Sequence, residues 1–166
     1  MPYPHRNARW YSLAFVIFIG DQAAKSYFDV TTPLGWSHEV TPFFNLVHVL
    51  NPGAAFSFLA GAGGWQRWFF LAIALGVSAW LVWLLAKPLH RLEAMAYSLV
   101  LGGATGNAFD RAVRGQVIDY LDFHLRGWHW PAFNIADIVI VSGAAALVLR
   151  SLVKVEGSGA ARKEAR

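Results

Sequence analysis

The chain has 166 residues, of which 56% are hydrophobic and only 14% are charged. Soluble domains carry about 25% charged residues, and the mean hydropathy of this chain is +0.39, so the composition indicates a membrane protein. There is no cysteine, which excludes disulfides and thiolate chemistry from the chain. The formal net charge of +4 comes mostly from basic residues that flank apolar segments, which indicates membrane topology rather than nucleic-acid binding.

Four apolar segments are each long enough to cross a hydrocarbon core of about 30 Å as a helix. They cover residues about 10–28, 68–86, 94–110 and 131–150. The second is free of charge and is flanked by Arg67 and Lys87, whereas the first contains Asp21 and Lys25. We therefore predict a membrane all-α fold with four transmembrane helices.

Residues about 30–66 have a different character, with three prolines, several glycines and a β-prone run at residues 43–50. This segment is too irregular for a transmembrane helix and too long for a tight loop. We predict an extracytoplasmic, β-rich flap or cradle that lies on the membrane. The sequence thus predicts one integral-membrane domain over residues 1–155, followed by a basic tail at residues 156–166 that is disordered.

The distribution of basic residues predicts the orientation of the chain in the membrane. Four spans place both termini on the same side of the membrane, and nine of the 14 Lys and Arg residues lie on that side. The positive-inside rule then puts both termini in the cytoplasm and the flap outside. The polar residues of the apolar segments gather at their outer ends, which predicts a shared site at the outer interface.

Two carboxylates eighteen positions apart, Asp119 and Asp137, are the strongest candidates for that site. Asp137 stands in an apolar segment with no cation beside it in sequence, and an acid kept in lipid at that cost is a functional-site hypothesis. When two carboxylates share a site, one keeps a proton and the other acts as a base. Such a pair can activate water to attack an amide bond.

Plainer interpretations stand beside these candidates. Asp137 is also explained as an acid at a helix N-terminus, and Asp119 as a solvated loop acid with Asp122 as its main competitor. Asp21 and Lys25, four positions apart, are most simply a structural ion pair.

Metal binding is not predicted. His124 and His129 are five positions apart, a spacing that suits no common pair of ligands on a helix, and the chain has no cysteine. We therefore expect neither a metal nor another cofactor. Two other functions remain open at this point: a small proton-coupled transporter, and a non-catalytic membrane assembly factor.

Five short motifs resemble those of bacterial lipoprotein signal peptidase, signal peptidase II, in order and spacing. They are Asp21-x-x-x-Lys25, Asn51-Pro-Gly-Ala-Ala-Phe-Ser57, Gly102-Gly-Ala-Thr-Gly-Asn-Ala-Phe-Asp-Arg111, Val117-Ile-Asp-Tyr-Leu121 and Phe133-Asn-Ile-Ala-Asp137. Each motif is short, but the set covers nearly the whole chain and is highly specific.

The resemblance implies a four-span aspartic endopeptidase of the bacterial inner membrane. It implies that the protein removes signal peptides from prolipoproteins by cutting before a diacylglyceryl-modified cysteine, with Asp119 and Asp137 as the catalytic pair. It places supporting residues around them, namely Asn51, Gly103, Asn107, Asp110, Arg111, Asn134 and Ala136. The expected partners are these prolipoproteins, membrane lipid and globomycin-type inhibitors. Nucleic acid is not expected as a partner, and we expect a monomer.

Overall fold

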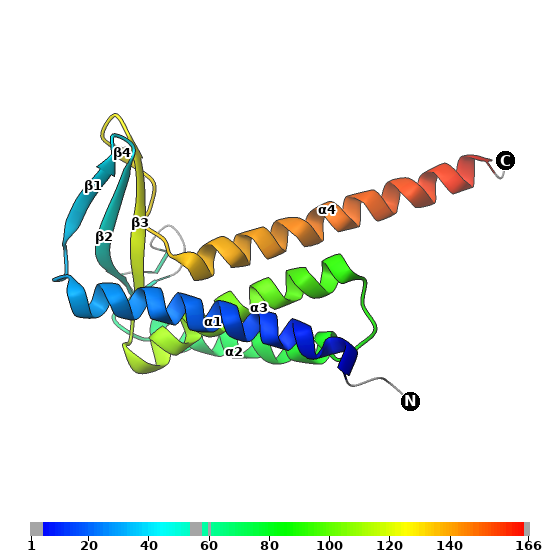
Figure 1. Cartoon of the computed structure of the whole chain (residues 1–166), viewed down its shortest axis with the longest axis horizontal. Helices are drawn as coiled ribbons and strands as arrows, with labels where there is room; N and C mark the ends of the chain where they lie inside the picture. The colour runs from blue at the N-terminus through cyan, green and yellow to red at the C-terminus, as the bar shows by residue number, and fades with distance from the viewer. Residues whose placement is uncertain (1–4, 54–57, 60, 165–166) are drawn as a thin grey trace.

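The computed structural model describes residues 5–53, 58–59 and 61–164. Along these residues the elements are α1 (His5–Thr31), β1 (Ser37–Thr41), β2 (Phe44–Asn51), α2 (Gln66–Leu85), α3 (Arg91–Val113), β3 (Val117–Leu125), β4 (Trp128–His129) and α4 (Ile135–Glu164). Helices α1, α2 and α3 form a bundle, and the sheet stands across one end of it (Figure 1). Helix α4 starts beside the sheet and runs along α3 toward the other end. The fold is therefore mostly helical with a small sheet, as the sequence predicts.

Small residues let α3 lie close to its neighbours. A methyl group at Gly102 would lie 2.7 Å from the Ala14 carbonyl oxygen on α1, and one at Gly103 would lie 2.5 Å from the Ala136 carbonyl oxygen on α4. Gly106 also faces α1, so the two glycines at G-x-x-x-G spacing serve close helix packing. The position of the first turn of α4 depends on α3 having no side chain at Gly103.

Two buried apolar clusters join the elements. The first lies between α1, α2 and α3 and consists of Ala14, Leu81, Leu85, Ala94 and Leu101. The second joins α1 to the sheet, because the rings of Phe28 and Tyr120 stack with their centroids 4.6 Å apart beside the buried Ile118. The second cluster holds the sheet at the end of the bundle.

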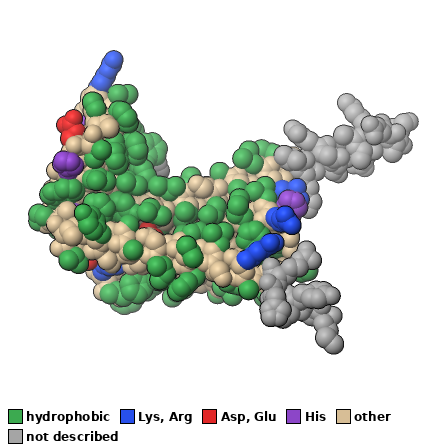
Figure 2. Space-filling model, viewed as in Figure 1, with side chains coloured by type: hydrophobic (Ala, Val, Ile, Leu, Met, Phe, Trp, Pro, Cys, Tyr) green, Lys and Arg blue, Asp and Glu red, His purple; other side chains and the backbone are tan. Residues whose placement is uncertain are grey.

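Large hydrophobic side chains cover much of the outer surface of the molecule (Figure 2). Within the described residues, two helices are long and apolar enough to cross a membrane, Gln66–Leu85 and the first part of α4, Ile135–Leu152. They correspond to the predicted spans 68–86 and 131–150. Helices α1 and α3 do not meet this criterion. They carry Asp21 and Asp110, whose side chains are fully buried.

The sheet is antiparallel, with the strand order β1-β2-β3-β4. The flap predicted at residues 30–66 contributes β1 and β2. The other two strands come from residues 117–129, so the prediction was too narrow. The run Val117–Leu125 is rich in β-branched and aromatic residues, which favour strands. It becomes a strand by pairing with β2, far away in the sequence.

Two predicted boundaries also differ from the structure. Helix α4 begins at Ile135 rather than at residue 131, because the chain first runs beside β3, where Phe133 forms a β-bridge with Leu121. The tail predicted to be disordered continues α4 as a helix as far as Glu164. From residue 160 on it consists of Ala, Arg, Lys and Glu, which have high helix propensity.

Candidate active site

Asp119 and Asp137 lie on two elements that the chain brings together by doubling back. Asp119 lies within β3, which follows the end of α3. After β4 the backbone returns along β3 through the bridge at Phe133. Asn134 therefore lies beside Asp119, and α4 begins with the next residue. This return places Asp137 in the first turn of α4, against the strand that carries Asp119.

The N-terminus of α4 is capped by side chains from β3, from α1 and from Asn134, the residue just before the helix. The N–H groups of its first two residues donate to the hydroxyl oxygen of Tyr120 on β3, at 3.3 Å, and to Asp21 on α1, at 3.0 Å. Asp137 N–H donates to Asn134 Oδ1 at 3.1 Å, and Asn134 N–H donates back to Asp137 Oδ2 at 3.2 Å. This reciprocal capping box satisfies N–H groups that a helix end otherwise leaves unpaired. It also fixes the direction of the Asp137 side chain.

All four oxygens of the two carboxyl groups accept an N–H group. Asp119 accepts from Asn134 Nδ2 at 2.6 Å and from Asn51 Nδ2 at 3.0 Å. Asp137 accepts from Asn107 Nδ2 at 2.9 Å, in addition to the backbone of Asn134. Asn134 thus contacts both acids, one through its side chain and the other through its backbone.

The surroundings of Asp119 raise its pKa above the ordinary value and so favour its protonated form more than water does. Asp119 lies in β3, outside the helices, yet it is only 2% exposed. Burial raises the pKa of Asp119 to about 7, and the nearby charge of Asp137 acts in the same direction. The hydrogen bonds from Asn51 and Asn134 oppose this rise. At neutral pH a proton on Asp119 is therefore available for chemistry.

A buried ion network lies directly behind this pair. Lys25 Nζ lies 2.8 Å from Asp21 and 2.9 Å from Asp110, and none of these three side chains is exposed. Arg114 Nη1 completes the network at 2.6 Å from Asp110. Arg114 Nε also lies 3.2 Å from Asp29, whose side chain is 44% exposed. The two cations match the two fully buried acids, Asp21 and Asp110, which offsets part of the cost of removing these charges from water. Lys25 also donates to Asn107 Oδ1 at 2.8 Å, which connects the network to Asp137.

Arg111 connects α3 to the end of β2. Its Nη2 donates to the Gly53 carbonyl oxygen at 2.7 Å, and its Nη1 donates to the Asn107 carbonyl oxygen at 3.2 Å. Arg67 on α2 in turn donates to the Arg111 carbonyl oxygen at 2.6 Å. These bonds hold the chain after Asn51 against the bundle. Residues 54–57 of the same motif lie outside the described residues.

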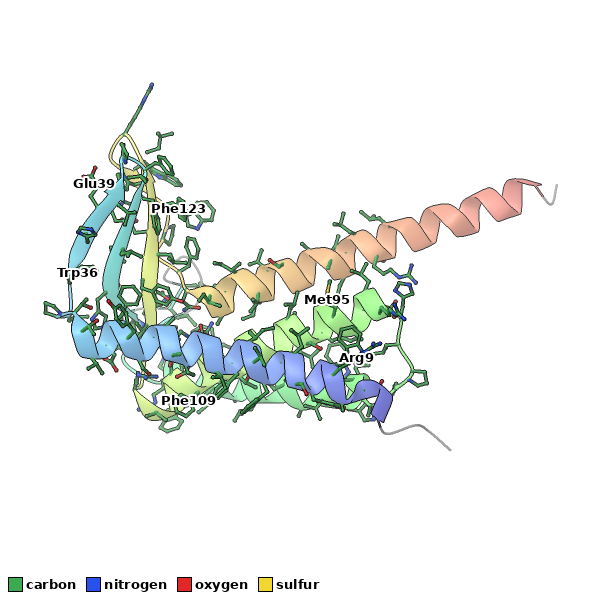
Figure 3. All side chains as sticks on the ribbon, viewed as in Figure 1. Arg9, Trp36, Glu39, Met95, Phe109 and Phe123 are labelled. Atoms are coloured by element: carbon green, nitrogen blue, oxygen red, sulfur yellow. The ribbon has the colours of Figure 1, made fainter. Side chains whose placement is uncertain are left out.

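A pocket of about 390 Å³ opens between the sheet and α4. Its polar part is formed by Asn51, Asn107, Arg111 and Asp137, and its apolar walls include residues 130–133 and Val141. Figure 2 shows the surface hollowed between the sheet and α4. Figure 3 places Phe123 on the side of the sheet nearest α4, with Trp36 and Glu39 toward β1. Asp137 lines this pocket, and Asn51, which also lines it, donates a hydrogen bond to Asp119.

The structure gathers the predicted site residues at one end of the bundle in two layers. The first layer contacts Asp119 and Asp137 and consists of Asn51, Asn107 and Asn134. The second layer lies next to these asparagines and consists of Asp21, Lys25, Asp110 and Arg111. Gly103 and Ala136 form the crossing of α3 and α4. Sequence reasoning missed Gln22 and Arg114, which bond to each other at 3.0 Å and both to Asp110. Arg114 follows Asp110 by four positions on α3, a spacing that could have indicated the pair.

The histidines contact other side chains of the sheet. His124 and His129 stack with ring centroids 4.9 Å apart, and His129 Nδ1 lies 2.9 Å from Asp122. In the described part of the chain, no group of three or more His, Cys, Asp or Glu residues could hold a metal ion.

The fold and site together define a membrane enzyme class. The structure superimposes with a TM-score of 0.81 on a bacterial membrane enzyme determined by the in meso method at 2.3 Å resolution, covering 90% of this chain and 91% of that one at 31% identity. A second bacterial membrane enzyme, determined at 1.9 Å, gives a TM-score of 0.75 at 32% identity, covering 87% and 93% of the two chains.

Sequence comparison gives the family. The family model for signal peptidase (SPase) II matches residues 13–153. The lipoprotein signal peptidase of Aeromonas hydrophila is 51% identical over 90% of this chain and 91% of its own length. That of Paraburkholderia phytofirmans is 53% identical over 91% and 88%. The chain belongs to the signal peptidase II family, a family of proteases, as the motifs predict.

Proposed function

We propose that this protein is an aspartic endopeptidase that removes signal peptides from prolipoproteins, cutting before a diacylglyceryl-modified cysteine. Family membership and the similarity to lipoprotein signal peptidases support the reaction and the substrate class. One observation carries the mechanism: Asp119 and Asp137 are held together by Asn134, and every oxygen of the two acids accepts an N–H group.

The two acids have surroundings that suit different roles. Asp137 lines the pocket at the positive end of α4 and accepts two N–H groups, which stabilises a carboxylate. Asp119, with its pKa raised to about 7, is partly protonated at neutral pH and can therefore supply a proton. Asp137 then serves as the base for water, and Asp119 as the acid for the carbonyl oxygen of the scissile bond.

The reaction balances with water as the second reactant. The water oxygen bonds to the carbonyl carbon while Asp137 takes a proton from water and Asp119 gives its proton to the carbonyl oxygen. The amide nitrogen then takes the proton from Asp137, the C–N bond breaks, and Asp119 recovers a proton from the diol. The products are a carboxylic acid on the signal peptide and a free amine on the lipidated cysteine.

Substrate must displace Asn51 from Asp119 for this chemistry to occur. Asn51 lines the pocket, and its Nδ2 lies 3.0 Å from Asp119. The same amide can then donate to the peptide backbone of the substrate. The apolar walls of the pocket suit the signal-peptide helix and the acyl chains, and they keep out water other than the nucleophile.

The membrane placement that we propose has four transmembrane helices, α1 to α4, in the bacterial inner membrane. The interior-facing charges of α1 and α3 are paired or hydrogen-bonded, which permits their burial in a bilayer. Lys and Arg side chains gather at the end away from the sheet (Figure 2), where Arg9 also lies (Figure 3). By the positive-inside rule this end is cytoplasmic, and the sheet and the pocket face outward.

The protein acts as a monomer in this proposal, because one chain supplies both acids and the pocket. Globomycin-type cyclic peptides would inhibit it by occupying the pocket beside Asp137. The transporter and assembly-factor alternatives gain no support from the family, and an assembly factor would not need the paired acids.

The test is a cleavage assay on purified protein in detergent. A synthetic prolipoprotein peptide with a diacylglyceryl-cysteine is incubated with wild type, Asp119→Asn and Asp137→Asn, with and without chelator, and mass spectrometry locates the cut. We expect cleavage before the lipidated cysteine that is insensitive to chelator. Each variant should lose about 10³-fold or more of kcat, because each removes one partner of the acid–base pair.

A matched peptide with an unmodified cysteine serves as the substrate control and should remain uncut. No cleavage by folded wild type would contradict the proposed reaction. Full activity in either variant would contradict the aspartic mechanism while leaving the reaction itself standing.

A further inference from the structure

We propose that Lys25 is a positioning residue for the acid pair, because its buried ammonium group fixes the side-chain amide of Asn107 so that its N–H groups face Asp137. This inference rests on the proposed function and extends it to a residue that does not contact the pocket. Taken alone, the sequence assigns Lys25 only an ion pair with Asp21.

The ammonium group of Lys25 has three N–H donors, and each has an acceptor. Two are the carboxylates of Asp21, at 2.8 Å, and Asp110, at 2.9 Å. The third is Oδ1 of Asn107, at 2.8 Å. The Lys25 side chain is 0% exposed, so water does not compete for these donors. An ion pair within α1 would be complete with Asp21 alone, and the bond to Asn107 therefore requires a separate explanation.

The bond to Lys25 determines which way the Asn107 amide points. An ammonium group donates hydrogen bonds and cannot accept them. The atom of Asn107 that faces Lys25 must therefore be its oxygen, and its nitrogen must face Asp137, 2.9 Å away. Asn134 Nδ2, 3.4 Å from the same oxygen, favours the same orientation.

The other two asparagines of the site are held in a similar way by backbone groups. Asn51 Oδ1 accepts from the Gly53 N–H at 2.9 Å, and Asn134 Oδ1 accepts from the Asp137 N–H at 3.1 Å. In each case one bond holds the amide oxygen, so the nitrogen is directed at a carboxyl group. At Asn107 the holding group is a charged side chain on another helix. Without it, the amide oxygen keeps the 3.4 Å contact from Asn134 Nδ2, so the direction of the amide nitrogen toward Asp137 is held less firmly.

Charge balance shows how to separate this role from a purely structural one. Removing Lys25 leaves Asp21 buried without a cation, whereas Asp110 keeps Arg114 at 2.6 Å. Leaving one buried charge unpaired is strongly destabilising. Replacing Asp21 by Asn in the same chain removes that charge and leaves an amide oxygen that can still accept the N–H of α4. The double replacement should therefore fold when Lys25→Met alone is destabilised.

The experiment compares wild type, Asp21→Asn, Lys25→Met, Asp21→Asn/Lys25→Met and Asp21→Asn/Lys25→Gln. The Tm in detergent, and kcat and KM on the lipidated peptide, are measured for each. We expect the double variant with Met to recover the Tm of Asp21→Asn. Its kcat should stay about 10²-fold below that of Asp21→Asn, with KM little changed, because a misplaced group costs about this much. The variant with Gln keeps an N–H donor and should have an intermediate kcat.

Three results would overturn the proposal. In the first, kcat recovers together with Tm in the Met double variant, which is the signature of a structural lysine. In the second, Asp21→Asn alone is as slow as the double variants, so Lys25 adds nothing. In the third, neither double variant folds, which assigns Lys25 to stability. If wild type does not cleave the lipidated peptide, the proposed function is contradicted instead, and the same assay shows this.

Discussion

Strands β2 and β3 carry two acid–asparagine pairs that use the same residue types and differ in their surroundings. In the inner pair, next to the helices, Asn51 donates to Asp119 at 3.0 Å. In the outer pair, farther along the same strands, Asn45 donates to Asp122 at 2.9 Å. Both asparagines lie on β2, and both acids lie on β3.

The difference lies in what stands behind each acid. Behind Asp119 are Asn134 and the N-terminus of α4. Beside Asp122 is His129, whose side chain is 53% exposed. Asp122 is itself only 7% exposed, so both acids are buried. The same two residue types on the same pair of strands thus make an acid that meets a helix N-terminus, with a pKa raised to about 7, in one place, and an acid beside a half-exposed histidine in the other. The acid–base role proposed for Asp119 therefore depends on the N-terminus of α4, which meets β3 at this point, and not on the strand pair alone.

The largest expected effect separates the two acids directly. Asp119→Asn should lose about 10³-fold or more of kcat, because Asn cannot supply the proton. Asp122→Asn should retain kcat within about twofold, because the partners of Asp122 are Asn45 and His129 on the sheet and not the groups that hold Asp137. The lipidated-peptide assay on both purified variants, with Tm as a check of folding, measures this contrast. If Asp122→Asn folds but is inactive, the outer pair rather than the inner pair would be assigned the chemistry.

A smaller effect is expected from moving the helix behind the inner pair. A methyl group at Gly103 would lie 2.5 Å from the Ala136 carbonyl oxygen, so Gly103→Ala forces α4 away from α3. We expect a loss of about 1–3 kcal/mol of stability, and about 10²-fold in kcat because Asp137 is displaced. Thermal melts and the cleavage assay measure the two losses.

Gly76 on α2 provides the control, because no atom lies within 4 Å of a methyl group placed there. Gly76→Ala should leave kcat unchanged and stabilise the helix by up to about 1 kcal/mol. Equal losses at Gly76 and Gly103 would mean that the crossing of α3 and α4 is not what holds the inner pair.

The smallest expected effect is a change with pH. The pKa of Asp119, about 7, lies above its ordinary value of 3.8. The folded protein therefore holds an extra proton between these values, and folding stability should fall as pH rises from about 4 to about 7. Activity needs this proton, so kcat/KM should fall about tenfold per pH unit above about 7. A pH profile of the wild type that stays flat to pH 9 would contradict Asp119 as the acid.

The two asparagines sharpen the pH test. Asn51 donates to Asp119 and opposes the rise of its pKa. In Asn51→Ala the decline of activity should move to higher pH, along with a lower kcat. Asn45→Ala, which removes the matching bond to Asp122, should leave the profile in place. A shift of equal size in both variants would mean that the inner pair has no special role.

Much of the helical part of the fold could be predicted from the sequence. A charge-free run between basic residues marks α2, and a run whose one charge before Arg150 is Asp137 marks the first part of α4. These two helices are apolar enough to cross a membrane. The apolar segment places the start of this span near residue 131, where Pro131 would be tolerated in a first helical turn. Residues 131–133 lie beside β3 instead, and that pairing has no signal within the segment itself.

The motifs predict which residues lie directly around Asp119 and Asp137. They do not predict the hydrogen bonds that join this layer to the buried ion network. Lys25 and Asn107 are 82 positions apart and lie on different helices. Nothing local to either residue predicts their hydrogen bond, which depends on how closely α1 and α3 pack at Gly102 and Gly106. Similarly, Asp21 caps α4 across 115 positions. Buried polar networks in a bundle are set by helix packing, and a sequence pattern alone does not specify them.

The chain enters α1 and leaves α4 at the end of the molecule away from the sheet (Figure 1). A fusion partner or affinity handle joined to either end is therefore separated from the pocket by the length of the bundle. The protein can be tethered by its tail to a bead or a sensor surface with the pocket still open to substrate. Inhibitor screening on immobilised protein thus becomes practical without altering any residue of the site.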